Sequence, residues 1–156
     1  MSRLRDSLND MLVNIFNHIT TLEGVTLKKM GIKVSMNEVH IIEAIHNNEI
    51  PTMTNVASML LITAGSLTTA VEKLVQKGYV IRYQEENDRR KVLLKLTAKG
   101  EEVIKIHDIF HDEMIENTIK DMHLDEESEL IPILENLSDY FRKKYQDRIE
   151  SMKSER

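Results

Sequence analysis

The sequence has no cysteine and little of the material that forms loops and β-sandwiches. Of its 156 residues, 5 are glycine, 2 are proline and only 4% are aromatic. Without thiols, the chain can form no disulfide, no thiolate-bound zinc site and no thiol redox sensor. Because loop formers and aromatic residues are so scarce, a β-sandwich is disfavoured and a mainly α-helical fold is predicted.

Long apolar runs are also missing from the sequence. No segment reaches the roughly 20 apolar residues of a membrane span, and acidic side chains interrupt the first apolar stretch, MSRLRDSLNDML. We therefore expect a cytoplasmic protein that has no membrane partner.

The net charge of −5 is distributed unevenly along the chain. Between Lys73 and Gly100, eight Lys or Arg residues stand against three acids, a local charge of +5 that leaves −10 for the rest. Because the local field governs attraction to phosphate, a basic module on an acidic body is able to bind nucleic acid. A solvated charged face gives the same count, so charge alone does not decide between them.

A helix-turn-helix followed by a hairpin is predicted in the middle of the chain. The first helix covers 53–60, and the second begins after Thr63, a suitable N-cap, and stops at Gly78. Two strand-like runs, 79–84 and 91–97, then enclose a polar connection. A winged helix-turn-helix uses such a helix and a basic hairpin to read duplex DNA, one part for each groove.

Amphipathic helices are predicted on both sides of this module. Apolar residues at helical spacing mark helices over 4–22 and 97–122, whereas the mixed segment 23–34 is predicted to be a loop or a broken helix. A last helix follows a break at 123–125. Within it, Pro132 either kinks the helix or lies in its first turn.

A further helix begins at Ser35, where Glu38 completes a capping box. We assign residues 35–100 to a winged helix-turn-helix DNA-binding domain, and residues 1–34 and 101–156 to dimerisation and ligand-pocket helices. Because the terminal helices are amphipathic and lack a domain's worth of partner within the chain, we predict a two-fold homodimer.

Motifs along nearly the whole chain resemble the MarR family of bacterial transcriptional regulators. They are the helix-turn-helix, the strand 79–82, the wing with Asp88-Arg89-Arg90, and the run Leu96-Thr97-Ala98-Lys99-Gly100. Within the family, SMNEVHIIEAI, TAGSLTTAVEKLVQKGYV and KIHDIFHDEMIENTIKDM look like the FabT-type repressors of fatty-acid biosynthesis genes. The resemblance implies a dimer that binds a palindromic operator in double-stranded DNA more tightly when acyl carrier protein presents long acyl groups to an apolar tunnel.

Candidate DNA contacts lie on the exposed side of the second helix and on the hairpin. A wheel with Leu67 at the centre of the buried face turns small polar side chains outward, and their hydroxyls can bond bases or phosphates. The glycine among them lets the backbone come close to the bases. The candidates are Thr63, Gly65, Ser66, Thr68, Thr69, Lys73, Arg82, Asp88, Arg89, Arg90 and Lys91. The plain alternative is a solvent face rich in small polar residues.

In the wing, Asp88 stands two residues before Arg90 and can hold it by a charge-assisted hydrogen bond. An arginine needs such a fixed direction to enter a minor groove. By resemblance, Asp88 orients Arg90, which enters the groove, while Arg89 and Lys91 meet phosphate. A charged hairpin turn without this role is the alternative.

His107 and His111 are four residues apart, so they share one face of the long helix. They could bind zinc if Asp108, Asp112, His40 or His46 completed the site. Because cysteine and an HExxH pattern are missing, we expect no metal and no cofactor, and histidines that pack through hydrogen bonds or line a pocket mouth. No nucleophile, paired carboxylates or Gly-rich phosphate loop accompanies them, so an enzyme is not expected.

Surplus apolar residues on the long helix indicate either a dimer core or a ligand pocket. The residues alone favour the dimer core, and only the family resemblance favours an acyl tunnel. The candidate lining residues are Ile15, Phe16, Ile19, His40, Ile42, Ile45, Ile106, His107, Phe110, His111 and Met114. Lys28, Lys29, Lys33 and Arg5 suit the docking of an acidic carrier protein, although a solvated loop explains them as well.

The sequence thus predicts a dimeric repressor of fatty-acid biosynthesis genes, with acyl chains on acyl carrier protein as co-repressor. The alternative is a MarR-family regulator that responds to another small lipophilic ligand, or to zinc through His107 and His111.

Overall fold

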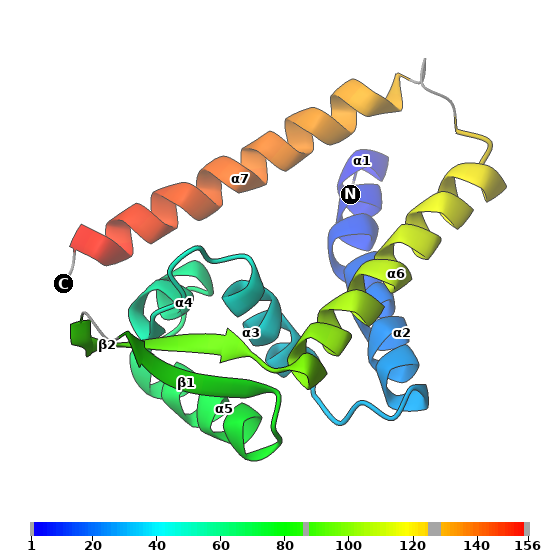
Figure 1. The fold of residues 1–156 in the computed structure, drawn as a ribbon. Helices are drawn as coiled ribbons and strands as arrows, with labels where there is room; N and C mark the ends of the chain where they lie inside the picture. Colours follow the sequence, from blue (N-terminus) through cyan, green and yellow to red (C-terminus); the bar gives the residue numbers. More distant parts are fainter. Residues whose placement is uncertain (1, 86–87, 125–128, 155–156) are drawn as a thin grey trace.

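The fold is mainly α-helical, with one two-stranded antiparallel hairpin, as predicted. The computed structural model describes residues 2–85, 88–124 and 129–154; the side chains of residues 85, 88–90, 152 and 153 lie outside that description. Its elements in chain order are α1 (Arg3–Asn9), η1 (Asp10–Ile15), α2 (Phe16–Lys29), α3 (Met36–His46), α4 (Met53–Met59), α5 (Ala64–Gln76), β1 (Val80–Glu85), β2 (Asp88–Leu96), α6 (Ala98–Asp121) and α7 (Leu130–Ser154) (Figure 1).

The first helical run is longer than the sequence indicated. It continues from α1 through the π-helical segment η1 into α2 and ends at Lys29. The predicted loop or broken helix over 23–34 is therefore wrong for residues 23–29, which are helical. A glycine inside a helix costs only about 1 kcal/mol, and burial of Leu27 against the core outweighs the effect of Gly24. The chain leaves the helix through Gly31, whose φ of 80° suits a residue without Cβ.

Three helices begin at the caps that the sequence predicted. The Ser35 hydroxyl accepts from the Glu38 amide at 3.3 Å, and the Glu38 carboxylate accepts from the Ser35 amide at 2.7 Å, which completes the capping box of α3. Thr63 and Thr97 cap α5 and α6 in the same way, each accepting from the amide three residues on. These caps fix where α3, α5 and α6 begin in the segment 35–100, the predicted winged helix-turn-helix, which is called the reading module below.

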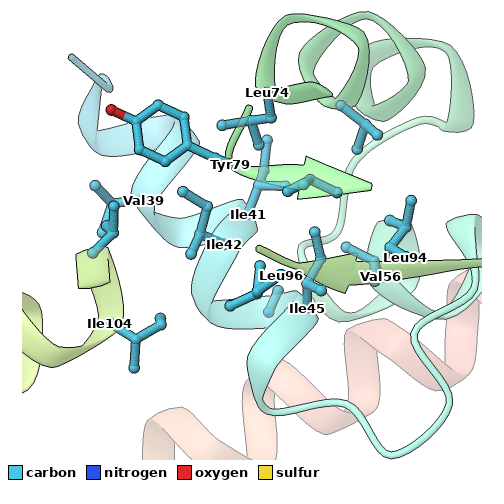
Figure 2. Packing of buried hydrophobic residues seen from close by; sticks show 14 of the residues in the cluster. Val39, Ile41, Ile42, Ile45, Val56, Leu74, Tyr79, Leu94, Leu96 and Ile104 are labelled. Atoms are coloured by element: carbon cyan, nitrogen blue, oxygen red, sulfur yellow. The ribbon is translucent and has the colours of Figure 1, made fainter. Parts of the chain in front are cut away.

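The hydrophobic core lies around α3, between α5, the hairpin and the first turns of α6 (Figure 2). The largest fully buried side chains are Leu27, Val39, Ile42, Val56, Leu67, Val71, Leu74, Tyr79, Val80, Leu94 and Val103. Each buried aliphatic side chain contributes about 1.5–3 kcal/mol, so this cluster holds the reading module together and anchors α2 and α6 to it.

The hairpin is longer than predicted. β2 begins at Asp88, so residues 88–90 are strand and the predicted polar connection over 85–90 was too long. Ladder hydrogen bonds come from the backbone, so polar side chains that look like a turn are compatible with strand. Val80 pairs with Leu96, and the register runs regularly to an irregularity after Gln84. β2 also touches the segment before α4, where the Leu94 amide donates to the Pro51 carbonyl at 2.9 Å.

The end of α5 and the start of α6 meet at one junction. Gly78, with a φ of 79°, turns the chain out of α5. The Thr97 hydroxyl donates to the Gly78 carbonyl at 2.7 Å, and the Thr97 amide donates to the Tyr79 carbonyl at 3.1 Å. Gly100 lets α6 approach this carbonyl so closely that an added Cβ would collide with it. These contacts hold the end of α5, the start of β1 and the start of α6 together.

α6 extends away from this core, and α7 runs back toward α4 (Figure 1). α6 ends before His123, which adopts a φ of 55°, and α7 begins at Leu130, so Pro132 lies in its first turn, as one of the two alternatives required. α7 contacts α4, where the Tyr145 hydroxyl donates to the Met59 carbonyl. Burial raises the pKa of Tyr145.

Within residues 2–85, 88–124 and 129–154, no single helix is both long and apolar enough to cross a membrane. α4 and α5 meet that length and composition only when taken together, and they are bent by 109° at the break between them.

Candidate nucleic-acid interface

The bend of 109° between α4 and α5 is that of a helix-turn-helix. The turn is made by Leu61, which adopts a φ of 54°, and by the Ile62 amide, which donates to the Ala57 carbonyl at 3.0 Å. Ala57 is completely buried where the two helices meet, and its small side chain permits that close contact. The second helix is thereby fixed in direction and leaves one long side exposed.

The N-terminal turn of α5 presents backbone donors and hydroxyls without a competing acid. Thr63 accepts from the Ser66 amide at 3.1 Å, and the two hydroxyls lie 2.9 Å apart. No acidic residue stands in the first turn, and Gly65 is exposed, where an added Cβ would meet only Thr63 Oγ1, at 4.0 Å. Because the N-terminus of a helix carries partial positive charge, this end attracts an anionic phosphate.

Thr68 and Thr69 are exposed, and their hydroxyl protons are already engaged. The hydroxyl of Thr68 donates to the Ala64 carbonyl at 2.8 Å and that of Thr69 to the Gly65 carbonyl at 3.3 Å. A threonine hydroxyl has one proton and two lone pairs, so each side chain offers only acceptor capacity to a ligand. In the major groove such acceptors suit the amino groups of adenine or cytosine.

Ser66, Thr69 and Lys73 lie along one groove of about 400 Å³ between α5 and the start of α3. Asn37 of α3 lines the same groove, which sequence patterns did not indicate. The structure thus brings together three of the predicted contact residues on one exposed side, and adds an amide side chain able to donate and accept.

The hairpin contributes exposed cations beside this helix. Arg82 on β1 and Lys91 on β2 have exposed side chains. The backbone of Asp88, Arg89 and Arg90 forms the first residues of β2, whereas their side chains lie outside the described part of the chain, so the predicted orientation of Arg90 by Asp88 stays a prediction.

Lys77 and Lys99 of the basic segment have structural partners. Lys77 places its ammonium 2.7 Å from one carboxylate oxygen of Glu38, and Lys99 donates to the Lys77 carbonyl at 2.9 Å and lies over the Tyr79 ring. Burial raises the pKa of Glu38, but the hydrogen bonds from Lys77 and Ser35 outweigh it and hold that pKa below its usual value. The charge that faces a ligand is therefore smaller than the sequence count.

A separate apolar groove of about 490 Å³ lies between α2 and α6. Its lining residues are Leu22, Thr26, Met30, Ile106, Ile109, Phe110, Glu113, Met114 and Asn117. Its size falls within the range of about 300–1,000 Å³ that is typical of ligand pockets. The sequence indicated Ile106, Phe110 and Met114. It missed the α2 side, because Thr26 and Met30 lie beyond residue 22, where the first helix was expected to end.

The remaining predicted ligand residues are distributed over several places. Ile42 and Ile45 are buried in the core of the reading module, and His40 lines a small groove beside the turn between α4 and α5. Ile15 and Phe16 are exposed on the first helical run, with Ile19 half-buried beyond them. The structure therefore gathers only the three α6 residues into the apolar groove.

His107 and His111 meet an acid that the sequence did not single out. The Nδ1 atom of His107 lies 2.5 Å from Glu23 Oε1, and Nε2 of His111 lies 3.5 Å from Glu23 Oε2. Glu23 comes from α2, 84 residues earlier in the chain than His107. His46, a predicted partner, instead lies 3.3 Å from Glu101. Ile19, Glu23 and Leu27 follow one another at intervals of four residues, so on a continuous helix they share one face. This spacing was the signal that α2 continues and carries Glu23 inward.

Comparison with known proteins gives a consistent family. The MarR family profile matches residues 34–92. The crystal structure of Streptococcus pneumoniae FabT in complex with DNA matches with a TM-score of 0.79 and 31% identity, over 91% of this chain and 98% of that chain. The chain belongs to the MarR family. Members of the MarR family are transcription regulators and not enzymes, in agreement with the sequence-based expectation.

Two curated relatives match shorter segments of this MarR-family chain. The HTH-type regulator YkoM of Bacillus subtilis is 31% identical over 98 residues, which is 62% of this chain and 63% of its own. BilQ of Clostridium symbiosum, also an HTH-type transcriptional regulator, is 35% identical over 74 residues, 47% of this chain and 51% of its own. The chain thus spans between half and two thirds of these relatives.

Proposed function

We propose that this chain is a dimeric repressor of fatty-acid biosynthesis genes that binds a palindromic operator in double-stranded DNA. The observation that carries the proposal is the exposed side of α5, where Ser66, Thr69 and Lys73 share one groove beside an acid-free helix N-terminus. In helix-turn-helix proteins the second helix enters the major groove of DNA and contacts base edges with its N-terminal residues. The hairpin cations Arg82 and Lys91 then contact the phosphate backbone or the minor groove of the DNA.

Dimer formation is supported by apolar side chains that the single chain leaves exposed. They gather on the terminal helices and include Leu4, Leu12, Phe16, Ile115, Ile119, Met122, Ile133, Leu134, Tyr140 and Phe141. A monomer rarely exposes so many large apolar side chains on neighbouring helices, whereas a two-fold interface buries them. Pairing through these helices sets the separation between two copies of α5, and hence the spacing of the half-sites.

The apolar groove between α2 and α6 supports an acyl chain as the ligand. Phe110 and Met114 give a wall that adapts to a flexible chain, and Glu113 and Asn117 offer polar groups near it. Lys28 and Lys29 stand in the last turn of α2, directly before the lining residue Met30. Their charge suits the approach of an acidic acyl carrier protein. FabT, with which this chain shares 31% identity, was crystallised with DNA.

A binding assay separates the parts of this proposal. Fluorescence anisotropy is measured on promoters of fatty-acid synthesis genes, with acyl carrier protein bearing either a long acyl chain or none. We expect salt-dependent binding that the acylated carrier strengthens. Lys73→Ala should weaken binding at all sequences and reduce the salt slope by about 1. If the wild type does not bind these promoters at all, the proposal is overturned.

The ligand is tested with a matched pair of apolar substitutions. Phe110→Ala changes the groove, whereas Ile50→Ala changes an exposed side chain in the loop before α4. Phe110→Ala should remove the effect of the acyl chain and keep the basal DNA affinity, and Ile50→Ala should keep both. If the acylated carrier has no effect on the wild type, the DNA-binding role stands and the fatty-acid role is overturned.

A further inference from the structure

The cluster of Glu23, His107 and His111 is unusual because it buries a carboxylate among imidazoles. Glu23 is only 3% exposed, and the side chains of His107 and His111 are 13% and 33% exposed. Carboxylates this deeply buried are paired through hydrogen bonds or coordinate a metal. The proposed binding of DNA and of an acyl chain uses none of these three side chains.

We infer that Glu23, His107 and His111 form a binding site for a divalent transition metal, with zinc as the cation that fits best. Two imidazoles and one carboxylate are a common ligand set for zinc in sites that keep an open position. The set contains no thiolate, so it suits metals that accept nitrogen and oxygen ligands.

The geometry of the donor atoms fits a single ion. One donor atom from each residue can be chosen so that all three lie within 4.8 Å of one another. Glu23 meets the two imidazoles through different oxygens, with Oε1 2.5 Å from His107 Nδ1 and Oε2 3.5 Å from His111 Nε2. These distances lie on either side of the roughly 3.3 Å between donors around tetrahedral zinc. Side-chain rotations would convert this hydrogen-bonded cluster into a coordination shell.

The surrounding residues support the imidazoles and limit access to the cluster. Glu43 of α3 places a carboxylate oxygen 3.9 Å from His107 Nε2, on the side of the ring away from Glu23. It can hold that imidazole in one orientation, as carboxylates beside metal-bound histidines commonly do. The Phe110 ring packs edge-on against the His111 ring at 5.4 Å and narrows access to the cluster.

A bound ion would join the two walls of the apolar groove. Glu23 follows the groove residue Leu22 on α2, and His107 and His111 each follow a groove residue on α6, Ile106 and Phe110. Metal binding therefore fixes the distance between α2 and α6 beside the groove. Glu43 extends this connection to α3 of the reading module.

The site is tested by direct metal binding to chelator-treated protein, in competition with a chromophoric zinc chelator. We expect one Zn²⁺ per chain. Glu23→Gln and His111→Ala should each weaken binding by at least the roughly 10- to 100-fold that supporting residues are worth. The matched control His18→Ala removes an exposed histidine of the same helix as Glu23 and should change nothing.

Two further measurements guard against misfolded variants and surface binding. Circular dichroism melting without metal shows whether each variant folds, and Glu23→Gln retains the shape of the side chain. Co²⁺ in place of zinc should give the intense visible absorption of a four-coordinate ion in the wild type and in His18→Ala, but not in His111→Ala. Absence of stoichiometric binding in the wild type, or equal affinity in folded Glu23→Gln, overturns the inference and leaves a hydrogen-bonded Glu–His cluster.

Discussion

The ammonium of Lys77 lies 2.7 Å from one carboxylate oxygen of Glu38 and 2.8 Å from the other. The same carboxylate accepts from the Ser35 amide and completes the cap of α3. One buried acid therefore holds the start of α3 and the end of α5 together, and these are the helices on either side of the groove that carries Ser66 and Thr69.

This contact makes stability depend on pH in a defined direction. The pKa of Glu38 is lower in the folded chain than in the unfolded chain, so its contribution is complete above the unfolded value and is lost as the pH falls through the folded value. Urea unfolding at constant protein concentration should show this loss in the wild type. In Glu38→Gln the stability should be lower at neutral pH and should fall less on acidification; parallel curves for the two proteins would contradict this role.

The other half of the pair gives an independent prediction. Lys77→Met keeps the length of the side chain and removes the charge that Glu38 binds. We expect a loss of roughly 1–2 kcal/mol at neutral pH in urea unfolding, since the contact is charge-assisted but half-exposed. Lys105→Met, at an exposed position of α6, is the matched control and should leave stability unchanged.

Gly100 is predicted to be required for the junction of α5, β1 and α6. A Cβ at this position would collide with the Tyr79 carbonyl oxygen and press on the Leu96 side chain. Gly100→Ala should destabilise the fold by about 1–3 kcal/mol despite the better helix propensity of alanine. Gly65→Ala, at the start of α5, is the control in thermal melting; its Cβ would make only an ordinary contact, so the variant should be neutral or slightly stabilising. Equal melting temperatures for the two variants would show that the junction can relax.

Thr69 is predicted to read a base through its hydroxyl oxygen. Thr69→Val keeps the shape of the side chain, removes the acceptor and should cost about 1–3 kcal/mol of discrimination at one operator position, measured by anisotropy on point-mutated operators. Thr118→Val is matched, because its hydroxyl also donates to the carbonyl four residues earlier, at 2.8 Å, but on α6. Unchanged preference in Thr69→Val would remove this side chain from base reading.

Arg90→Ala is predicted from the sequence to abolish specific operator binding with little change in melting temperature. The physical reason is that an arginine inserted into a narrow minor groove adds affinity and shape readout, whereas a charged side chain in a wing is not expected to take part in the hydrophobic core. Lys95→Ala, exposed on β2, controls for the loss of one positive charge. Retention of full affinity in Arg90→Ala would exclude the wing from recognition.

The fold of the reading module was largely predictable because its signals are local. Ser35, Thr63 and Thr97 cap the helices they were expected to cap, and Gly78 ends α5 with a positive φ. Capping and turn chemistry depend on a few neighbouring residues, so a single sequence carries them. The apolar spacing around Leu67 also placed the exposed side of α5 correctly.

The sites outside that module depend on contacts between distant segments, which local patterns do not encode. Gly24 suggested a break in the first helix, but packing of Leu27 kept the helix continuous and carried Glu23 to the histidines of α6. Ile42 and Ile45 were expected beside a ligand because they are apolar, yet they fill the core. An apolar residue at helical spacing shows that it is buried, and not which partner buries it.

The junction at Gly78 and Thr97 has a mechanical consequence. Hydrogen bonds and the close approach at Gly100 join the end of α5 to the beginning of α6. We therefore expect the two helices to move as one unit. A rotation of α6 then turns α5 as well, and the displacement of α5 grows with its distance from the rotation axis. In the proposed dimer, a small rotation of α6 would therefore change the distance between the two copies of α5 by a larger amount.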